Sequence, residues 1–331
     1  MSIRALTYFL VAAEELNFTK AAGKLYVTQQ TLSNHIKRLE EQYDVQLFNR
    51  YPRLRLTPSG ECMVRYATRI LRLERAMNAE FADLSQNTSG VLFVGCSRMR
   101  GKYYLPKIWS VYRQKYPNIE IRMLEGNSDF LMSELLAHKL DICIGMNVSD
   151  LLEITFEPLI TEQVYLVINR DLFKKQLGEA AEEKARQFYK GVRCSDLLQI
   201  PLLLQPQSNY IRKIINQSYE AFDVIPRAIF ESNDSELLCN MSIAGNGGAF
   251  LPESGFLLPV ELIKYKLPHL YAFPLIDVKV SSMIAYPKNS PQLRYLQEFI
   301  AVCHQVFNDT QSRMRELGNL PSEFDQPDPT L

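Results

Sequence analysis

The sequence predicts a mixed fold class, α followed by α/β: a helical unit at the N-terminus, one long helix, and an α/β unit that takes up the rest of the chain. Three observations lead to this prediction. Residues 1–45 show the spacing of short helices, apolar residues recur at every seventh position over 63–84, and after residue 90 apolar strands alternate with helical segments. With 331 residues the chain is long enough for two or three domains.

The N-terminal unit should hold three short helices. The first lies within 4–15, where apolar residues fall on one face at helical spacing. Thr19 and Thr28 are each placed to cap the helix that follows, over 19–25 and 29–43. The third helix should bury a stripe made of Leu32, Ile36, Leu39 and Tyr43.

The opposite face of the third helix is polar, and its side chains are of the types that read DNA. Amide and guanidinium groups form paired hydrogen bonds with base edges, while hydroxyl and ammonium groups hold phosphates. A solvated surface helix would show the same polarity, so the pattern alone leaves both interpretations open. The polar face and its cap consist of Thr28, Gln29, Gln30, Thr31, Ser33, Asn34, Lys37 and Arg38.

The charge of this unit favours an anionic partner. Residues 1–60 carry eight basic and five acidic side chains, a net charge of +3, whereas the whole chain has 37 of each sign. The N-terminal residues of a recognition helix reach deepest into the groove. We therefore expect base contacts from Gln29, Gln30, Ser33 and Asn34, and backbone contacts from Lys37, Arg38, Arg53 and Arg55.

Residues 45–60 lead into the long helix. Two short extended segments flank Tyr51-Pro52, and the helix should start near Pro58. About three heptads of apolar residues predict pairing with the same helix of a second subunit, although Glu80 interrupts the companion series. Packing against the helix's own chain is the alternative that the spacing leaves open. The two series are Met63, Ile70, Met77 and Leu84, with Tyr66 and Leu73 beside them.

The polar stretch 85–90 marks a domain boundary, and beyond it the pattern predicts βαβ units with a mostly parallel sheet. Two sets of alternating elements follow, and the C-terminal residues return to the sheet. Strands are predicted at 91–96, 119–124, 141–145, 164–169, 201–206, 228–232, 247–252, 271–275 and 281–287, and helices at 104–115, 129–138, 209–221, 234–243 and 291–308.

The segments LTYFLVAAEELNFTKAAGKLYVTQQTLSNHIKRLEEQYDVQLFNR and RLRLTPSG resemble the winged helix-turn-helix of LysR-type transcriptional regulators. The paired alanines, the V-T-Q…L-S…I…L-E core, the L-F…R and the L-T-P-S-G wing end carry the resemblance. It implies a dimerising linker helix and a C-terminal periplasmic-binding-protein-like domain of two α/β subdomains. The implied boundaries are 1–60 for the winged helix-turn-helix, 61–87 for the linker, 88–308 for the effector domain (first half about 90–162 and 270–308, second half about 163–269), and 309–331 for a tail.

This sequence departs from the family pattern at two reading positions. Family members usually have Pro where Gln30 stands and often have Arg where Asn34 stands. The bases read at these positions are therefore left open, while the fold prediction is unaffected.

The resemblance also implies a small-molecule effector between the two subdomains, at the carboxyl ends of the strands. Many relatives carry a basic residue where Met146 stands, and here Arg98 and Arg100, in a first loop predicted to be longer than usual, would supply that charge to an anionic effector. Helix capping is the alternative role for Ser97, Asn127, Gln207 and Ser208. The expected effector residues are Cys96, Ser97, Arg98, Arg100, Asn127, Ser128, Met146, Gln205, Gln207, Ser208 and Asn246.

Other chemistry finds little support in the sequence. The stretch 245–248 lacks the full dinucleotide-binding motif, the four histidines have no Cys or carboxylate at ligand spacing, and there is no G-x-S-x-G elbow. The six cysteines form no CxxC pair, and inert buried thiols are favoured over a redox pair of Cys194 and Cys239. We expect no metal, no cofactor and no enzyme activity.

The prediction is thus a sequence-specific DNA-binding regulator whose activity a small molecule controls. Its partners would be double-stranded promoter DNA, the effector, further copies in a dimer or tetramer, and RNA polymerase, with no membrane. The N-terminus shows no signal peptide and no apolar run is long enough to span a bilayer, which predicts a cytoplasmic protein. The alternative is a solute-binding protein or enzyme on the same two-lobed fold.

Overall fold

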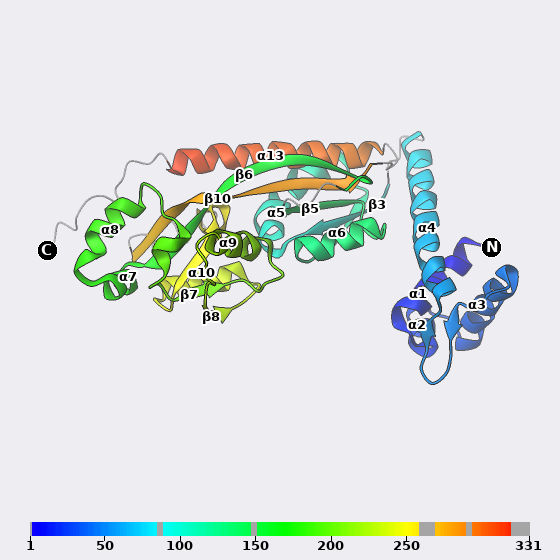
Figure 1. Ribbon diagram of the computed structural model, residues 1–331. Helices are drawn as coiled ribbons and strands as arrows, with labels where there is room; N and C mark the ends of the chain where they lie inside the picture. The colour runs from blue at the N-terminus through cyan, green and yellow to red at the C-terminus, as the bar shows by residue number, and fades with distance from the viewer. Residues whose placement is uncertain (1, 85–88, 147–150, 258–268, 289–292, 319–331) are drawn as a thin grey trace.

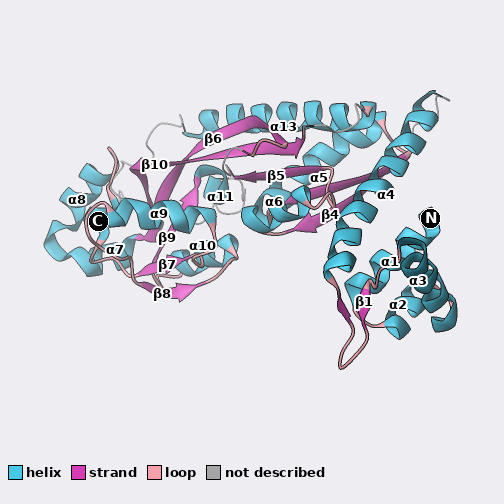
Figure 2. Cartoon of the chain, turned by 45° about the vertical axis from the view of Figure 1, so that its right-hand side comes forward, coloured by secondary structure: helices cyan, strands magenta, loops and turns pink. Residues whose placement is uncertain are grey.

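The computed structural model describes residues 2–84, 89–146, 151–257, 269–288 and 293–318 (Figure 1). A small helical domain, a long helix and an elongated α/β domain follow one another along the chain (Figures 1 and 2). This order confirms the predicted fold class. Among the described residues, no helix combines the length and the apolar character that a membrane span requires.

Three helices build the N-terminal domain: α1 (Ile3–Glu15), α2 (Phe18–Lys24) and α3 (Gln29–Tyr43). The apolar stripe of α3 is buried as predicted, except for Tyr43, which is 43% exposed because it lies at the last position of the helix, beyond the core. The small side chains of α2 let the helices approach closely. The core consists of Ala5, Leu6, Phe9, Ala12, Ala21, Ala22, Leu32, Ile36, Leu39, Leu47, Phe48 and Ala67.

The two predicted caps have different outcomes. Thr28 caps α3, because its hydroxyl accepts a hydrogen bond from the backbone N–H of Thr31 at 3.1 Å. The prediction for Thr19 is wrong. The cap of α2 is Asn17, whose side chain accepts from the N–H of Lys20 at 3.0 Å, so that Thr19 lies inside the helix.

A short hairpin follows the third helix. Its strands β1 (Phe48–Asn49) and β2 (Arg55–Leu56) pair antiparallel, and the loop between them protrudes from the domain as a wing (Figures 1 and 2). The linker helix α4 (Pro58–Leu84) starts where it was predicted to start. The wing is therefore tied to both the helical domain and the linker.

Glycine is required where α4 leaves the wing. A Cβ added at Gly60 would lie 2.2 Å from the carbonyl oxygen of Leu47, so the backbones touch directly at this point. The hydroxyl of Thr57 accepts from the N–H of Gly60 at 3.0 Å and donates to the carbonyl of Gln46 at 2.6 Å. These contacts fix the angle between the wing and the helix.

The predicted apolar seam of α4 divides into two parts. Met63 and Ile70 are half-buried against the N-terminal core, so the alternative of packing on the same chain applies to these positions. The side chain of Leu84 lies outside the described residues. The exposed fractions of the other seam residues are large: Tyr66 57%, Leu73 61% and Met77 47%. Phe81, which the predicted seam did not include, is 60% exposed.

One eight-stranded sheet runs through the whole α/β domain, in the order β4-β3-β5-β10-β6-β9-β7-β8. Two of its strands are long and extend across the domain (Figure 1). The strands are β3 (Gly90–Cys96), β4 (Ile119–Glu125), β5 (Ile142–Met146), β6 (Ile154–Asn169), β7 (Leu202–Leu204), β8 (Ala228–Glu231), β9 (Gly248–Pro252) and β10 (Leu270–Pro287).

The prediction of a mostly parallel sheet holds at the two ends and is wrong in the middle. Strand β3 is parallel to β4 and β5, and β7 is parallel to β8 and β9. The central strands β6 and β10 are antiparallel to each other and to their neighbours. The strand predicted at 164–169 is only the end of β6, and those predicted at 271–275 and 281–287 are parts of the single strand β10.

Helices cover both faces of this sheet, and most of them lie where they were predicted. Three were not predicted, namely α7, α8 and α11. The last helix runs to Gly318, so residues 309–318 of the predicted tail are helical, and residues 319–331 lie outside the described part. The helices are α5 (Arg98–Lys115), α6 (Ser128–Leu136), α7 (Arg170–Leu177), α8 (Ala181–Phe188), α9 (Tyr210–Glu220), α10 (Ser235–Ile243), α11 (Glu253–Leu257) and α13 (Arg294–Gly318), with short 3-10 turns at Gly178–Ala180 and Cys194–Leu197.

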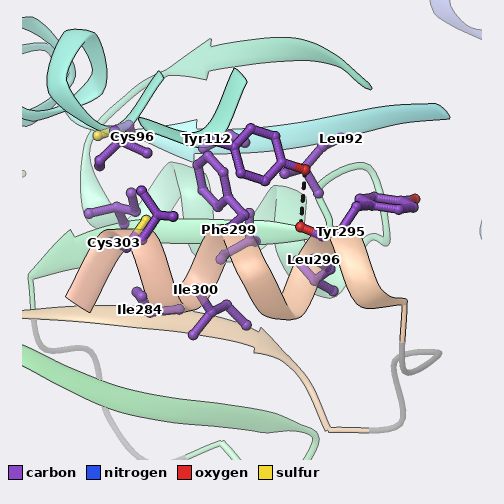
Figure 3. Close-up of a cluster of buried hydrophobic side chains, with 14 of the residues drawn as sticks. Leu92, Cys96, Tyr112, Ile284, Tyr295, Leu296, Phe299, Ile300 and Cys303 are labelled. Carbon is purple, nitrogen blue, oxygen red and sulfur yellow. Dashed lines mark hydrogen bonds between the residues drawn. The ribbon is translucent and has the colours of Figure 1, made fainter. Parts of the chain in front are cut away.

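The domain has two lobes, each with its own core. In the first lobe α13 packs on α5 and the sheet, and the hydroxyl of Tyr112 donates to the carbonyl of Tyr295 at 3.0 Å (Figure 3). In the second lobe α7, α8 and α9 pack on β6, β9 and β10. Side chains from 271–280 lie in this second core, so the assignment of 270–280 to the first half is wrong. The reason is that β10 crosses both lobes.

Polar contacts join the linker helix to the first lobe. The Nε of Arg69 donates to the Nε2 of His138 at 2.6 Å, and Arg72 Nη1 lies 3.3 Å from the Nδ1 of the same ring. Arg72 also donates to Asp141 at 3.2 Å, and Asp141 accepts the backbone N–H of Phe93 at 3.0 Å. Burial and the two guanidinium groups lower the pKa of His138 from its ordinary value.

Candidate DNA-reading surface and effector cleft

The polar face of α3 is open to solvent. Of the predicted reading residues, only Ser33 is half-buried. The opposite face of the helix packs into the core through Leu32, Ile36 and Leu39. This orientation presents the N-terminal turns of α3 outward, as groove reading requires. The exposed residues are Thr28, Gln29, Gln30, Thr31, Asn34, Lys37 and Arg38.

The wing adds cationic side chains beside this helix. Arg53 and Arg55 are exposed on the wing, as a role in phosphate binding requires. The neighbouring Arg50 is also exposed, but its guanidinium group is held 3.4 Å from the carboxylate of Glu40 and over the ring of Phe18. Arg50 thus positions the wing, while the two arginines beyond it are available to an anionic partner.

Hydroxyl groups order the start of α3. The hydroxyls of Thr28 and Thr31 lie 2.8 Å apart, which links the cap to the first turn. The hydroxyl of Thr19 on α2 donates to the amide oxygen of Gln29 at 2.9 Å. The side chain of Gln29 is therefore held from the neighbouring helix.

The second candidate site is a cleft between the two lobes, with a cavity volume of about 540 Å³. Helices α5 and α6 of the first lobe and α9 and α10 of the second meet here (Figure 1). All four begin at the cleft, because their N-cap residues Ser97, Asn127, Asn209 and Asp234 line it. The N-terminal ends of helices attract negative charge, which makes the cleft suited to an anion.

Three of these caps are satisfied by their own side chains, and one is not. Asn127, Asn209 and Asp234 accept hydrogen bonds from the first turn of their helices. Ser97 makes no such bond, so the first N–H groups of α5 receive no side-chain cap. Asn127 thus has the predicted capping role. Ser97 stands at the N-cap position of α5, but its side chain does not cap the helix.

Arg98 and Arg100 lie in the first turn of α5 and not in a long loop, because the helix begins directly after Ser97. Arg98 is exposed and paired with Glu125 at 3.5 Å and with Asp234 at 4.0 Å. Its charge is therefore already balanced by carboxylates of both lobes.

Arg100 is buried, with only 2% of its surface exposed. Its Nε donates to Ser282 at 2.7 Å, and its Nη2 lies 3.9 Å from the equally buried carboxylate of Glu162. That Nη2 has no hydrogen-bond partner among the described residues. A buried donor without a partner is costly, and it gains most when a ligand oxygen arrives.

Ion pairs join the helices of the two lobes. Lys102 of α5 pairs with Glu236 of α10, and Lys213 of α9 pairs with Asp129 of α6 at 2.6 Å. Together with the contact between Arg98 and Asp234, these pairs bridge the two lobes. Most of these charges are thereby compensated, and Glu162 also pairs with Arg100. What remains for an anion is the uncapped start of α5 and the Arg100 Nη2, which has no hydrogen-bond partner among the described residues.

The structure brings together five of the predicted effector residues and leaves five outside the cleft. Cys96 and Gln205 are fully buried, and Gln205 donates to the carbonyl of Phe250 at 3.3 Å. Gln207 bonds to Asn216, and Asn246 lies after the C-terminal end of α10, away from its cleft end. The backbone of Met146 ends β5, and its side chain lies outside the description. The cleft contains Ser97, Arg98, Arg100, Asn127 and Ser128; Cys96, Gln205, Gln207, Ser208 and Asn246 do not line it.

Several cleft residues were missed by sequence reasoning. The strand at 228–232 and the helix at 234–243 were both predicted, and the turn between them follows a carboxyl end of a parallel strand, where ligands bind. That rule identifies 233–236, and the same rule applied to α9 identifies 209–211. The missed residues are Met99, Lys102, Tyr103, Glu125, Gly126, Asn209, Tyr210, Ile211, Asn233, Asp234, Ser235, Glu236 and Gly255.

Five of the six cysteines are buried, and Cys62 is half-buried. Cys194 and Cys239 are each 1% exposed, and burial raises the pKa of Cys96 and Cys143 to about 12. Thiols in such surroundings are poor nucleophiles. Within the described ranges no group of His, Cys, Asp and Glu side chains could hold a metal ion.

Comparison with known protein families places both parts of the chain. Residues 3–61 match the model of the bacterial regulatory helix-turn-helix protein, lysR family, and residues 85–308 match the model of the LysR substrate binding domain. The chain belongs to the LysR family. It is a DNA-binding transcriptional regulator with an effector-binding domain, in a family of regulators and not of enzymes.

Individual relatives agree with this assignment along most of the chain. The regulator BenM of Acinetobacter baylyi is 27% identical over 316 residues, covering 93% of this chain and 96% of BenM. A probable RuBisCO transcriptional regulator of Phaeodactylum tricornutum is 27% identical over 270 residues, covering 79% of this chain and 83% of that protein.

Solved structures show the same fold. A full-length OxyR variant of Pseudomonas aeruginosa, with one cysteine replaced by aspartate, aligns with a TM-score of 0.66 at 22% identity, covering 93% of this chain and 95% of that chain. CbnR in complex with its target DNA aligns with a TM-score of 0.61 at 20% identity, covering 92% of this chain and 100% of CbnR. The three-part architecture described above is therefore shared with full-length regulators.

Proposed function

We propose that this LysR-family regulator reads its operator with the exposed face of α3 and holds the flanking phosphates with Arg53 and Arg55 of the wing. The observation that carries the proposal is that α3 buries one face in the core and presents amides and hydroxyls on the other. A relative, CbnR, has been solved with its target DNA. The wing protrudes on the same small domain, where it would meet the DNA backbone (Figure 2).

Loss of one reading amide tests this role. Gln29→Ala should lower affinity for an operator selected with the parent protein by about 1–3 kcal/mol, and leave binding to random DNA nearly unchanged. Gln42→Ala, at the far end of the same helix, is the matched control and should bind as the parent does. Equal losses on operator and random DNA would show that Gln29 serves the backbone and not a base.

We further propose that the effector is a small anion held at the start of α5. The first turn of that helix has no side-chain cap, and Arg100 offers a buried Nη2 without a partner among the described residues. A carboxylate there would meet the N-terminal end of the helix, the hydroxyl of Ser97 and the guanidinium group. Arg98, which the sequence suggested as an equal partner, contributes less because its side chain is 72% exposed and water screens its charge.

Thermal-shift screening of the full chain against small monocarboxylic and dicarboxylic acids, with neutral amides of the same shape alongside, tests this proposal. Calorimetry then measures the acid with the largest shift. Arg100→Lys keeps the charge but removes the forked donor, and should cost about 1.5–3 kcal/mol of binding. Arg122→Gln, on an exposed pair with Glu120 outside the cleft, is the control. Stabilisation by an amide and by no acid would contradict the proposal.

We also propose that the protein self-associates through α4. Tyr66, Leu73, Met77 and Phe81 form an exposed apolar stripe along one side of this helix. Their steps of seven, four and four positions keep them on one side of the helix, and an exposed apolar stripe of this kind is typical of a helix that pairs with its own copy. The pairing would place two α3 helices on successive turns of the operator.

A further inference from the structure

Thr19 lost its predicted role as a helix cap, and its hydroxyl has a different partner. Asn17 caps α2, which leaves the hydroxyl of Thr19 free to point across to the recognition helix. There it donates to the amide oxygen of Gln29 at 2.9 Å. The contact joins α2 to the first residue of α3, ten positions further along the chain.

This bond determines which way the Gln29 amide faces. An amide group is planar, so holding its oxygen on the side of α2 turns its two N–H groups away from α2 and toward the solvent in front of α3. A carbonyl oxygen has two lone pairs, and Thr19 uses one of them. What remains is one acceptor beside one donor, the pattern that pairs with the N6 and N7 edge of adenine in the major groove.

The bond also reduces the freedom of a long side chain. An unrestrained exposed glutamine samples many rotamers, and binding must fix all of them at a cost in entropy. A glutamine side chain that a neighbouring helix already holds loses less conformational entropy on binding. Preorganisation of this kind improves affinity for the correct base and leaves binding to other DNA unaffected, because only the correct base uses the amide.

We propose that Thr19 is a positioning residue that orients the amide of Gln29 for paired recognition of an adenine. The inference rests on the proposed reading role of Gln29 and adds how that role is set. A direct phosphate contact by the same hydroxyl is the competing interpretation, and it makes different predictions for a double substitution.

The test uses the full-length protein and an operator selected from random duplexes. Thr19→Val keeps the shape and removes the hydroxyl; Thr19→Ser keeps a hydroxyl; Thr7→Val, on α1, is a matched control for loss of a hydroxyl in the same domain. Affinity is measured on the operator and on random DNA, in each variant and in combination with Gln29→Ala. Thermal unfolding verifies that each variant is folded.

We expect Thr19→Val to bind the operator about fivefold more weakly, the size of one net hydrogen bond, and to bind random DNA as the parent does. Thr19→Ser and Thr7→Val should retain parental affinity. In the Gln29→Ala background, Thr19→Val should cause no further loss. Replacing the contacted adenine by 7-deazaadenine should lower the affinity of the parent protein more than it lowers the affinity of the Thr19→Val variant.

Four results would overturn the inference. Additive losses in the double variant, or an equal loss on random DNA, would assign Thr19 to a phosphate. A loss in Gln29→Ala with parental affinity in Thr19→Val would refute the positioning role and keep the reading role. Parental affinity in Gln29→Ala would remove the proposed reading role itself, and the inference with it.

Discussion

The exposed stripe of α4 gives a quantitative prediction for Leu73→Ala. Fully burying a leucine side chain contributes about 1.5–3 kcal/mol, and 61% of Leu73 is exposed in the single chain. Pairing would therefore bury a further part that contributes about 1–2 kcal/mol in each subunit, or about 2–4 kcal/mol in a dimer. Because alanine retains a methyl group, we expect a loss at the lower end of this range, about 2 kcal/mol. A loss of this size raises the Kd of the dimer about thirtyfold.

Sedimentation equilibrium over a range of protein concentrations measures this change directly. The control is Asn78→Ala, an exposed position on another side of α4 that bonds along its own helix, to Glu74. Leu73→Ala should dissociate at higher concentration than the parent, and Asn78→Ala should not. A parent that stays monomeric, or a dimer that Leu73→Ala leaves unchanged, would refute the assignment of the stripe.

Three further predictions concern the linker and its contacts. Met77→Lys would bury a charge in the same stripe, so the variant should be monomeric. A variant that remains dimeric in light scattering would contradict this prediction. Gly60→Ala should lower the free energy of unfolding by about 1–3 kcal/mol in urea, because its Cβ would meet the carbonyl of Leu47, while Gly23→Ala, with nothing within 4 Å, should not destabilise. As the pH falls below 6.5, stability should drop more in the parent than in His138→Gln: the pKa of His138 is lowered in the folded state, so the unfolded chain binds the additional proton. Equal pH profiles in thermal melts would disprove this contribution.

Much of the N-terminal domain could be predicted because its elements are local. The stripe of α3, its cap and the start of α4 each depend on residues a few positions apart, and helical spacing records such relations directly. The misplaced cap shows the limit of this reasoning. Asn17 and Thr19 are both good caps, and only the packing of α2 decides between them.

The central strands were harder because their partners are distant in the sequence. Strand β6 pairs with β10, more than a hundred positions further on, and polar residues such as Glu162 interrupt its apolar pattern. That Glu162 is buried only becomes understandable with Arg100 beside it, supplied by a helix of the other part of the chain. The cleft was also hard to predict, because its second wall comes from the starts of α9 and α10, which are distant in the sequence from α5 and α6.

The long pair β6 and β10 also connects the two lobes directly. Both strands continue from one lobe into the other without a loop, and their pairing shifts register twice, between Pro274 and Lys279 and between Ser282 and Met283. Ser282 accepts a hydrogen bond from the Nε of Arg100 and lies at one of these two irregular points. A ligand bound at Arg100 would therefore be connected, through the hydrogen bond to Ser282, to the strand pair that both lobes share.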